Sequence, residues 1–401
     1  MFSLPRRSYA LRIAFDARSL TSPILRGWDR YTVGLVKALA QQSIEIVLFH
    51  RESAPLHPPH VHALDCGTQG LPDRGGLHWE QVAVPNALRT GKFDLYHAPA
   101  EHGVPLAAPC PVVLTVHSVT TQSYQRLIKQ GLLPGNLNDY LGYERTLYHK
   151  WFAWGYSRLQ LARASHILTP SDFCRREVIE LLNIPPRRVT TTLLAVHDQF
   201  NRPPSTLAEL KAVLDRLDIK SPYLLYVGGY EPHKNVSGLL KIFAKVNQQR
   251  ADLSLVLVGS KFYPEELARQ ARQMGLGSNV VFLVNLTDDL TALYDGAELF
   301  VSLSWRETFC LPALEAMTRG VPVVASAWGA TPEVVSQGGR LVDPRDHETA
   351  AKVILEALAS TDRENWSTIA RQVAARFQWS TTASDTLKIY HRLAGITRKA
   401  A

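Results

Sequence analysis

The stretch Ser302–Gly320, SLSWRETFCLPALEAMTRG, decides the fold. Together with the apolar residues before it, this stretch predicts a buried strand at Leu299–Leu303, a short loop and then a helix. Pro312 opens that helix, where proline is favourable because its missing N–H would have no partner in the first turn. A buried strand followed closely by a helix is typical of an α/β protein.

Two carboxylates, Glu307 and Glu315, bracket the predicted helix start. Free amides of the first helical turn lie at the positive end of the helix dipole and suit an anion such as a diphosphate. These amides belong to Cys310, Leu311, Ala313 and Leu314. A phosphate site with a carboxylate on each side suits a ligand with hydroxyls at both ends, as a nucleotide-sugar has. The alternative is an ordinary helix start, because the dipole alone favours glutamate there.

Short apolar runs alternate with helical patterns along the whole chain, and their continuous hydrophobicity predicts parallel strands buried on both faces. The expected strands are Leu11–Phe15, Ile44–Phe49, Phe93–His97, Val112–His117, His166–Thr169, Val189–Leu194, Tyr223–Val227, Leu253–Val258, Val280–Leu283, Leu299–Leu303, Val323–Ala325 and Arg340–Val342. The proline-rich segment Phe200–Leu207 reads as a linker. We therefore predict two Rossmann-like α/β domains with a cleft between them, and ligands at the carboxyl ends of the strands.

Composition narrows the class of protein. The chain has 401 residues, 46% of them hydrophobic and 20% charged, which fits two ordinary globular domains. No apolar run is long enough to span a membrane, no signal peptide is recognisable, and the four cysteines form no close pair, so we expect a cytoplasmic, reduced protein. The net charge of +8 would suit nucleic acid, an anionic membrane or anionic substrates, but no nucleic-acid-binding motif is present.

The segment Tyr140–Arg163 combines aromatic and basic residues at helical spacing. Such a helix suits a peripheral contact with an anionic membrane or a lipid-linked substrate. The alternative, which we favour, is an amphipathic helix whose aromatic residues pack into its own domain.

Candidate ligand-binding residues in the first half follow the predicted strands. They are Asp16, Gly27 and Trp28 after the first strand, Glu101 and His102 after the third, and His117 at the end of the fourth. Glycine at position 27 could admit a close approach of substrate to the backbone. Asp29 could instead be the N-cap of the following helix, and a histidine at a strand end is often structural.

In the second half, the strand Tyr223–Val227 runs into a loop with two glycines, Gly228 and Gly229, followed by Lys234. A lysine at a helix start is disfavoured by the dipole, which suggests that it binds a phosphate. Asn285–Asp288, after a later strand, could meet a nucleobase or could be an ordinary loop with a helix cap.

In this order, the motifs resemble those of the retaining glycosyltransferases of family 4, which have the GT-B architecture. The resemblance rests on DARSL, GWDRYT, HWEQVAVP, YHAP, LTVHS, ILTPSDFCRREV, YVGGYEPHKN, the paired glutamates, GVPVVAS and ATPEVV, and it covers nearly the whole chain. It implies an acceptor domain at residues 1–200 and a donor domain at 201–380. It also implies that the last helix, within 381–401, crosses back onto the first domain.

The resemblance also implies roles for residues. It implies that Glu315 binds the ribose, Glu307 the donor sugar, Lys234 the diphosphate and His117 the sugar from the first domain. The remaining expected donor contacts are Gly27, Gly228, Gly229, His233, Asn285, Thr308, Phe309, Cys310 and Leu311, and the acceptor side comprises Asp16, Trp28, Glu101 and His102. No metal or other cofactor is implied.

The implied reaction is transfer of a hexosyl unit from a nucleotide-diphosphate sugar to a lipid-linked or oligosaccharide acceptor in cell-surface polysaccharide synthesis. The EPHKN stretch resembles members that transfer mannose. The family's arginine near the lysine is absent, since Gly229 and His233 occupy the two places that it could take. A protonated His233 could replace part of the missing arginine. The alternative is a non-catalytic nucleotide-sugar-binding protein that partners an active transferase.

Overall fold

The computed structural model describes residues 11–21, 27–50, 61–66, 76–133, 136–137, 147–259, 264–286 and 288–395. It divides the chain into two compact units, each built on its own parallel sheet. Unit 1 contains Met1–Arg126, Gly135–Leu194 and Gln378–Ala401, and unit 2 contains Leu127–Pro134 and Ala195–Phe377. Within the part of the chain that is described, no helix is both long and apolar enough to cross a membrane.

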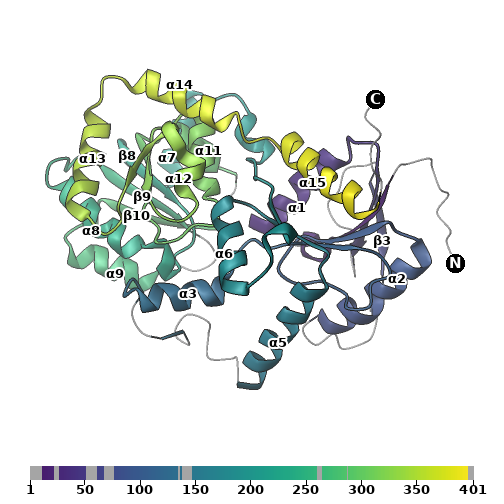
Figure 1. Ribbon diagram of the computed structural model, residues 1–401. Coiled ribbons are helices and arrows are strands. Elements are labelled where there is room, and N and C mark those ends of the chain that lie inside the picture. Colours follow the sequence, from purple (N-terminus) through teal and green to yellow (C-terminus); the bar gives the residue numbers. More distant parts are fainter. Residues whose placement is uncertain are drawn as a thin grey trace. The chain divides into compact units, whose positions relative to one another are not determined.

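Unit 1 has a seven-stranded sheet in the order β3-β2-β1-β4-β5-β6-β7. Figure 1 labels its edge strand β3. Its strands are β1 (Arg12–Asp16), β2 (Glu45–His50), β3 (His62–Asp65), β4 (Leu95–Ala98), β5 (Val112–Thr115), β6 (His166–Thr169) and β7 (Val189–Thr191). Its helices are η1 (Arg18–Thr21), α1 (Gly27–Leu39), the π-helical turn η3 (Trp79–Ala83), α2 (Val84–Gly91), α3 (Thr120–Lys129), α5 (Leu147–Arg163), α6 (Asp172–Leu182), η4 (Pro186–Arg188) and α15 (Trp379–Leu393).

Unit 2 has a six-stranded sheet in the order β10-β9-β8-β11-β12-β13. Its strands are β8 (Tyr223–Val227), β9 (Ser254–Gly259), β10 (Val280–Val284), β11 (Leu299–Ser302), β12 (Val323–Ser326) and β13 (Arg340–Val342). Its helices are η5 (Asp198–Asn201), α7 (Leu207–Arg216), η6 (Pro232–Lys234), α8 (Val236–Asn247), α9 (Glu265–Gln273), α10 (Leu290–Asp295), α11 (Leu311–Arg319), α12 (Thr331–Val335), η7 (Ser336–Gly338), α13 (His347–Ala359) and α14 (Arg363–Ala374).

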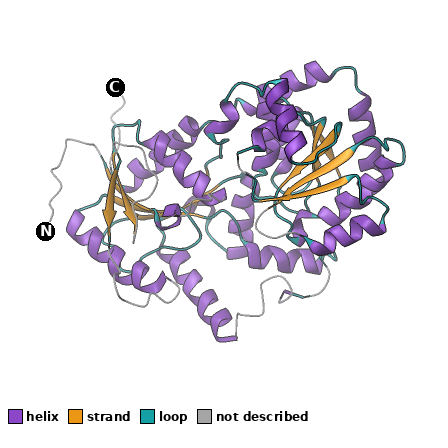
Figure 2. Ribbon diagram, turned by 180° about the vertical axis from the view of Figure 1, so that it is seen from behind, coloured by secondary structure: helices purple, strands orange, loops and turns teal. Residues whose placement is uncertain are grey.

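The predicted class is confirmed: both sheets are parallel and covered by helices, as Figure 2 shows. Most central strands are buried along their whole length, which is why they read as continuous apolar runs. The prediction missed β3, an edge strand of sequence HALD that pairs only with β2 and exposes His62 and Ala63. A short edge strand without an apolar run gives no periodicity to detect.

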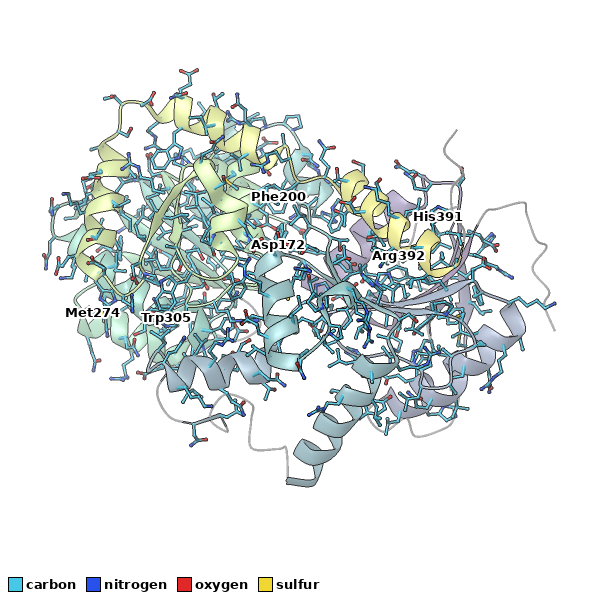
Figure 3. The ribbon with its side chains drawn as sticks, viewed as in Figure 1. Asp172, Phe200, Met274, Trp305, His391 and Arg392 are labelled. Carbon is cyan, nitrogen blue, oxygen red and sulfur yellow. The ribbon has the colours of Figure 1, made fainter. Side chains whose placement is uncertain are left out.

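Helix α15 groups with unit 1 and packs on α1. Gly34 makes the approach possible, because a Cβ there would lie 2.3 Å from the Trp379 ring. Thr382 Oγ1 donates to Leu193 O, 2.5 Å away. Arg392, labelled in Figure 3, donates to His166 Nδ1 over 3.1 Å.

The passages between the units lie at Leu194–Ala195 and Phe377–Gln378, rather than at 200 and 380. The proline-rich segment read as a linker is held within unit 2. Phe200 is buried, and the Arg319 guanidinium donates to the carbonyl oxygens of Phe200, Arg202 and Pro203. The prolines and polar residues of this stretch therefore belong to a segment that is hydrogen-bonded within unit 2, and not to a linker.

Candidate active site

The turn between β11 and α11 carries an ion pair. Lys234 Nζ donates to both carboxylate oxygens of Glu307, at 3.0 and 2.9 Å. Ser304 Oγ donates to the same carboxylate over 2.8 Å. Only 20% of the Lys234 side chain and 12% of the Glu307 side chain are exposed. The sequence assigned both residues to one ligand site, and the structure brings them into direct contact although they are 73 residues apart.

Backbone contacts fix the two loops that carry this pair. The Trp305 amide donates to His233 O over 2.8 Å, and the buried Asn235 Nδ2 donates to Leu303 O over 2.9 Å. The loop after β8 is thus bonded to the loop after β11 on both sides of Lys234. This arrangement positions the ammonium before any ligand binds.

The pair stays ionised at neutral pH. Burial disfavours the ammonium, but the Glu307 carboxylate outweighs burial and raises the pKa of Lys234. Burial likewise works against the carboxylate, but Lys234 outweighs it and lowers the pKa of Glu307. Burial, reinforced by the neighbouring Lys234 ammonium, lowers the pKa of His233 to about 3. The expectation that a protonated His233 replaces the missing arginine is therefore wrong for the unliganded chain.

The start of α11 presents fewer open amides than the sequence suggested. The amides of Ala313 and Leu314 donate to Cys310 O, at 3.1 and 3.4 Å, so the expectation that they are free is wrong. The amides of Cys310 and Leu311 have no hydrogen bond to the described residues, and Cys310 has a left-handed backbone with φ of 73°. An anion would meet these two amides first.

Glu315 lies within the first turns of α11 and is only 2% exposed. The Tyr294 hydroxyl, from α10, donates to Glu315 Oε2 over 2.8 Å. The Tyr294 ring in turn packs edge-on against Phe200, with centroids 5.6 Å apart. Sequence reasoning missed Tyr294, because a tyrosine in a short helix reads as a core residue.

Two further features support the Glu307 loop. The Phe309 ring is buried against Phe377, so this residue can offer a ligand only its backbone. Gly329 has a φ of +70°, and a Cβ there would lie 2.6 Å from Glu307 N. The next residue, Ala330, donates its amide to Glu307 O over 2.9 Å. Sequence reasoning missed Gly329, whose need for glycine depends on a contact between two loops.

In unit 1, His117 lies just after β5 and is half-buried. Its Nε2 is 2.8 Å from Pro99 O, and because a carbonyl only accepts, Nε2 carries the proton. The amides of His117 and Ser118 both donate to Glu101 Oε1, each over 2.8 Å. The Tyr31 ring lies edge-on to the imidazole at 4.8 Å. In the neutral ring, Nδ1 is therefore a hydrogen-bond acceptor.

A buried polar chain lies behind His117. The Tyr31 hydroxyl bonds Thr115 Oγ1 at 2.9 Å, Thr115 Oγ1 bonds His97 Nε2 at 2.7 Å, and His97 Nδ1 bonds the Tyr390 hydroxyl of α15 at 2.5 Å. Burial, with a smaller effect of His117, lowers the pKa of His97 to about 3. His97 is therefore a neutral structural residue that ties α15 to the sheet.

Asp16 is held by neighbouring side chains of unit 1. It is 5% exposed and accepts hydrogen bonds from Arg18 and from the Tyr96 hydroxyl. Arg18 also donates to Glu80, which accepts from Tyr156 over 2.5 Å. The Asp16 carboxylate thus belongs to a buried charge cluster, and its place on the acceptor side stays a prediction.

Both halves of the chain match models of glycosyltransferase families. Residues 215–373 match the model of glycosyl transferases group 1, and residues 25–199 match that of glycosyltransferase family 4. The O-antigen chain mannosyltransferase B of Escherichia coli is 34% identical over 96% of this chain and 100% of its own length. The chain belongs to glycosyltransferase family 4.

Another relative is similar over nearly the whole chain. The D-inositol 3-phosphate glycosyltransferase 2 of Catenulispora acidiphila is 32% identical over 98% of this chain and 96% of its own. Among solved structures, a sucrose-phosphate synthase from Thermosynechococcus elongatus superposes with a TM-score of 0.71 at 20% identity, over 96% of this chain and 100% of that one. This family 4 chain is thus a glycosyltransferase with the GT-B fold.

The remaining expected site residues of this family 4 enzyme lie in loops or, for Gly27 and Trp28, in the first turn of α1. A Cβ at Gly27 meets nothing within 4 Å, whereas one at Gly229 would overlap the Glu231 carboxylate. Exposed or half-buried positions are occupied by Trp28, His102, Gly228, Asn285 and Thr308. Asp29 is not an N-cap, because α1 already begins at Gly27.

Much of the aromatic segment Tyr140–Arg163 lies outside the described residues, and so do the side chains of residues 147–154 of α5. Further along α5, the Tyr156 hydroxyl accepts from Gln81 Nε2 over 2.7 Å, and Gln160 Nε2 donates to Glu80 over 2.7 Å. This end of the helix therefore packs on its own domain. No group of three or more potential metal ligands occurs within the described ranges.

Proposed function

We propose that this family 4 glycosyltransferase transfers a mannosyl unit from a nucleotide-diphosphate mannose to a hydroxyl of a lipid-linked or oligosaccharide acceptor. We further propose that it retains the anomeric configuration and needs no metal ion. The observation that carries the proposal is the ion pair between Lys234 and Glu307 beside the start of α11.

On the donor side, Lys234 leaves Glu307 and binds the diphosphate, together with the amides of Cys310 and Leu311. A cation and aligned amides can stabilise the charge that develops on the leaving diphosphate. Glu307 then accepts hydrogen bonds from the donor sugar, and Glu315 accepts them from the ribose. Further donor contacts come from Gly27, Gly228, Gly229, His233, Asn285, Thr308 and Phe309, and His117 contacts the sugar from unit 1.

In the proposed reaction, the bond between the anomeric carbon and the diphosphate oxygen breaks as the bond to the acceptor oxygen forms on the same face. The acceptor hydroxyl loses its proton to the departing diphosphate. Lys234 offsets the charge on that group, so the step requires no divalent cation.

The choice of mannose is supported by the relatives. Besides the Escherichia coli O-antigen protein, an MMP alpha-(1->4)-mannosyltransferase of Mycolicibacterium hassiacum is 27% identical over 79% of this chain and 74% of its own. The name of the first relative refers to an O-antigen chain. By this similarity we propose that the acceptor is a growing cell-surface polysaccharide or its lipid-linked precursor.

The test is to incubate the full chain with guanosine, uridine and adenosine diphosphate sugars and octyl glycoside acceptors, with and without EDTA. We expect nucleotide release with a mannose donor, an α-configured product by NMR and no loss of rate in EDTA. Tight nucleotide-sugar binding without turnover, even with membrane extract, would favour the alternative of a non-catalytic partner protein. An inverted product or a loss of activity that magnesium restores would refute the corresponding part of the proposal.

A lipid-linked acceptor places the enzyme at the cytoplasmic face of a membrane, and we propose a peripheral contact there. The net charge of +8 favours binding to anionic lipid. Flotation with vesicles of phosphatidylglycerol and phosphatidylcholine should recover more protein than flotation with phosphatidylcholine alone. Equal recovery from both would refute an electrostatic membrane contact.

A further inference from the structure

The loop after β4, which is bonded to the backbone of His117, presents a carboxylate oxygen to solvent. Glu101 Oε1 is occupied, because it accepts the amides of His117 and Ser118. Glu101 Oε2 has no hydrogen-bond partner among the described residues, and it is not among their buried, unpartnered side-chain atoms. One oxygen of this carboxylate thus fixes the loop while the other is open to a ligand.

The orientation of His117, on the neighbouring loop after β5, adds a second open acceptor. Its Nε2 proton is donated to Pro99 O, which leaves the Nδ1 lone pair without a partner among the residues that the structure describes. Glu101 Oε2 and His117 Nδ1 both accept hydrogen bonds and donate none. Groups that bind here must therefore donate hydrogen bonds, as hydroxyls do.

Charge disfavours an anionic ligand at this point. The carboxylate is negative, and two arginines that contact the segment from Pro99 to Val119 are bonded to other groups: Arg18 to Asp16 and Glu80, and Arg163 to the carbonyl oxygens of Leu106 and Ala108. A phosphate would meet two hydrogen-bond acceptors and repulsion from Glu101. A neutral polyol can donate hydrogen bonds to both acceptors and is not repelled by the carboxylate.

We propose that Glu101 is an acceptor-positioning residue, whose Oε2 accepts a hydrogen bond from a hydroxyl of a neutral sugar in the acceptor. The inference rests on the proposed function and adds to it the chemistry recognised beside His117. The group bound at these loops is a glycan hydroxyl, and any phosphate of a lipid-linked acceptor lies elsewhere. Glu101 takes no proton in the reaction; it orients the sugar that carries the reacting hydroxyl.

An isosteric substitution separates the two oxygens. In Glu101→Gln the amide carbonyl can still accept the His117 and Ser118 amides, while an NH₂ donor replaces the open oxygen. Glu101→Ala removes both. A merely structural role predicts that Glu101→Ala lowers the melting temperature and that Glu101→Gln leaves sugar binding unchanged.

The experiment measures binding of octyl α-D-mannopyranoside to the full chain by saturation-transfer NMR, with a nucleoside diphosphate present. We expect Glu101→Gln to weaken binding by about ten- to a hundredfold, the loss expected for a hydrogen bond to a charged group. Glu180→Gln, which changes an exposed glutamate of the same unit, is the matched control and should bind as the wild type does.

Mannosides that each lack one hydroxyl identify the contact. The deletion that weakens binding to the wild type should cost nothing in Glu101→Gln, because the partner is already lost. Equal binding by the wild type and Glu101→Gln would overturn the inference, and so would a wild type that binds no neutral octyl glycoside. The proposed function fails by a different result, the absence of turnover with every nucleotide-sugar.

Discussion

Replacing Lys234 with methionine tests the ion pair on which the donor site depends. The substitution keeps the length of the side chain and removes its ammonium, so that the Glu307 carboxylate keeps the hydrogen bond from Ser304 Oγ but loses its cation. Deleting one partner of a buried pair costs about 3–5 kcal/mol, and exposed pairs contribute about 0–1 kcal/mol. With the two side chains 20% and 12% exposed, we expect the free energy of unfolding of unit 2 to fall by about 2–4 kcal/mol.

The effect depends on pH in a defined way. The pKa of Glu307 is lowered in the folded chain, so its contribution is present above the ordinary value of 4.5 and disappears as the pH falls through the folded pKa. The pKa of Lys234 is raised, so its contribution is present below 10.5 and disappears as the pH rises through the folded pKa. The difference between wild type and Lys234→Met should therefore be greatest near neutrality and shrink at low pH.

A second substitution separates stability from activity. Glu307→Gln added to Lys234→Met removes the uncompensated carboxylate, so the double variant should regain most of the lost stability. It should not regain activity: loss of a group that stabilises leaving-group charge lowers kcat by about 10²–10³, and the double variant lacks that group too.

Calorimetry and steady-state kinetics provide the measurements. A change of 1 kcal/mol shifts the melting temperature of a domain of 150–250 residues by about 2–4 °C, so Lys234→Met should melt roughly 5–15 °C lower. Lys211→Met, in which the lost partner belonged to an exposed pair with Asp215, is the control and should change little. A double variant as unstable as the single one, or a Lys234→Met protein with wild-type kcat, would refute the reasoning.

Three further predictions follow from the contacts. Gly329→Ala should lower the free energy of unfolding by at least about 2 kcal/mol and should also lower kcat/KM, because the added Cβ would overlap the backbone of the loop after β11. Gly275→Ala is the control in thermal unfolding: its φ of +76° is similar but its surroundings are open, so it should lower the free energy of unfolding by only about 1 kcal/mol. Tyr294→Phe removes the hydroxyl that donates to Glu315 and should weaken nucleoside diphosphate binding by about fivefold in calorimetric titration; unchanged affinity would count against the ribose role. The pKa of His97 is about 3 in the folded chain against an ordinary 6.5, so its contribution to the free energy of unfolding is lost as the pH falls below 6.5. His97→Gln removes this titration and should reduce the acid destabilisation at pH 5 by about 2 kcal/mol, which the melting temperature as a function of pH measures.

The sequence predicted both sheets because buried parallel strands leave a strong local signal. All twelve expected strands appear, and β3 was missed because its residues His62 and Ala63 lie exposed at a sheet edge. The segment after residue 200 was misread for a related reason. Composition marks Pro203 and its neighbours as a linker, but the Arg319 guanidinium that binds their carbonyl oxygens lies more than 100 residues further along the chain.

The sequence grouped Glu307 with Lys234 because each residue type carries its own chemistry, and the two are in contact, while their roles toward a donor stay predictions. The candidate site was not predictable where a neighbour decides the outcome. Asp16 has the position of a ligand-binding residue after a strand, but Arg18 and Tyr96 occupy its carboxylate. His233 has the position of a cation, yet burial keeps it neutral. Local sequence specifies which groups are available, and packing decides which of them remain open to a ligand.

The contact between Lys234 and Glu307 has a consequence for how the donor binds. An unpaired charge in a mostly buried site is costly, so neither side chain can leave the other without a replacement partner. In the proposed function, a diphosphate replaces the carboxylate as the partner of Lys234, and sugar hydroxyls replace the ammonium as donors to Glu307. A nucleotide without its sugar supplies only the first replacement and leaves Glu307 short of a partner. The pair therefore couples recognition of the diphosphate to recognition of the sugar, and it favours the intact nucleotide-sugar over the nucleotide that remains after transfer.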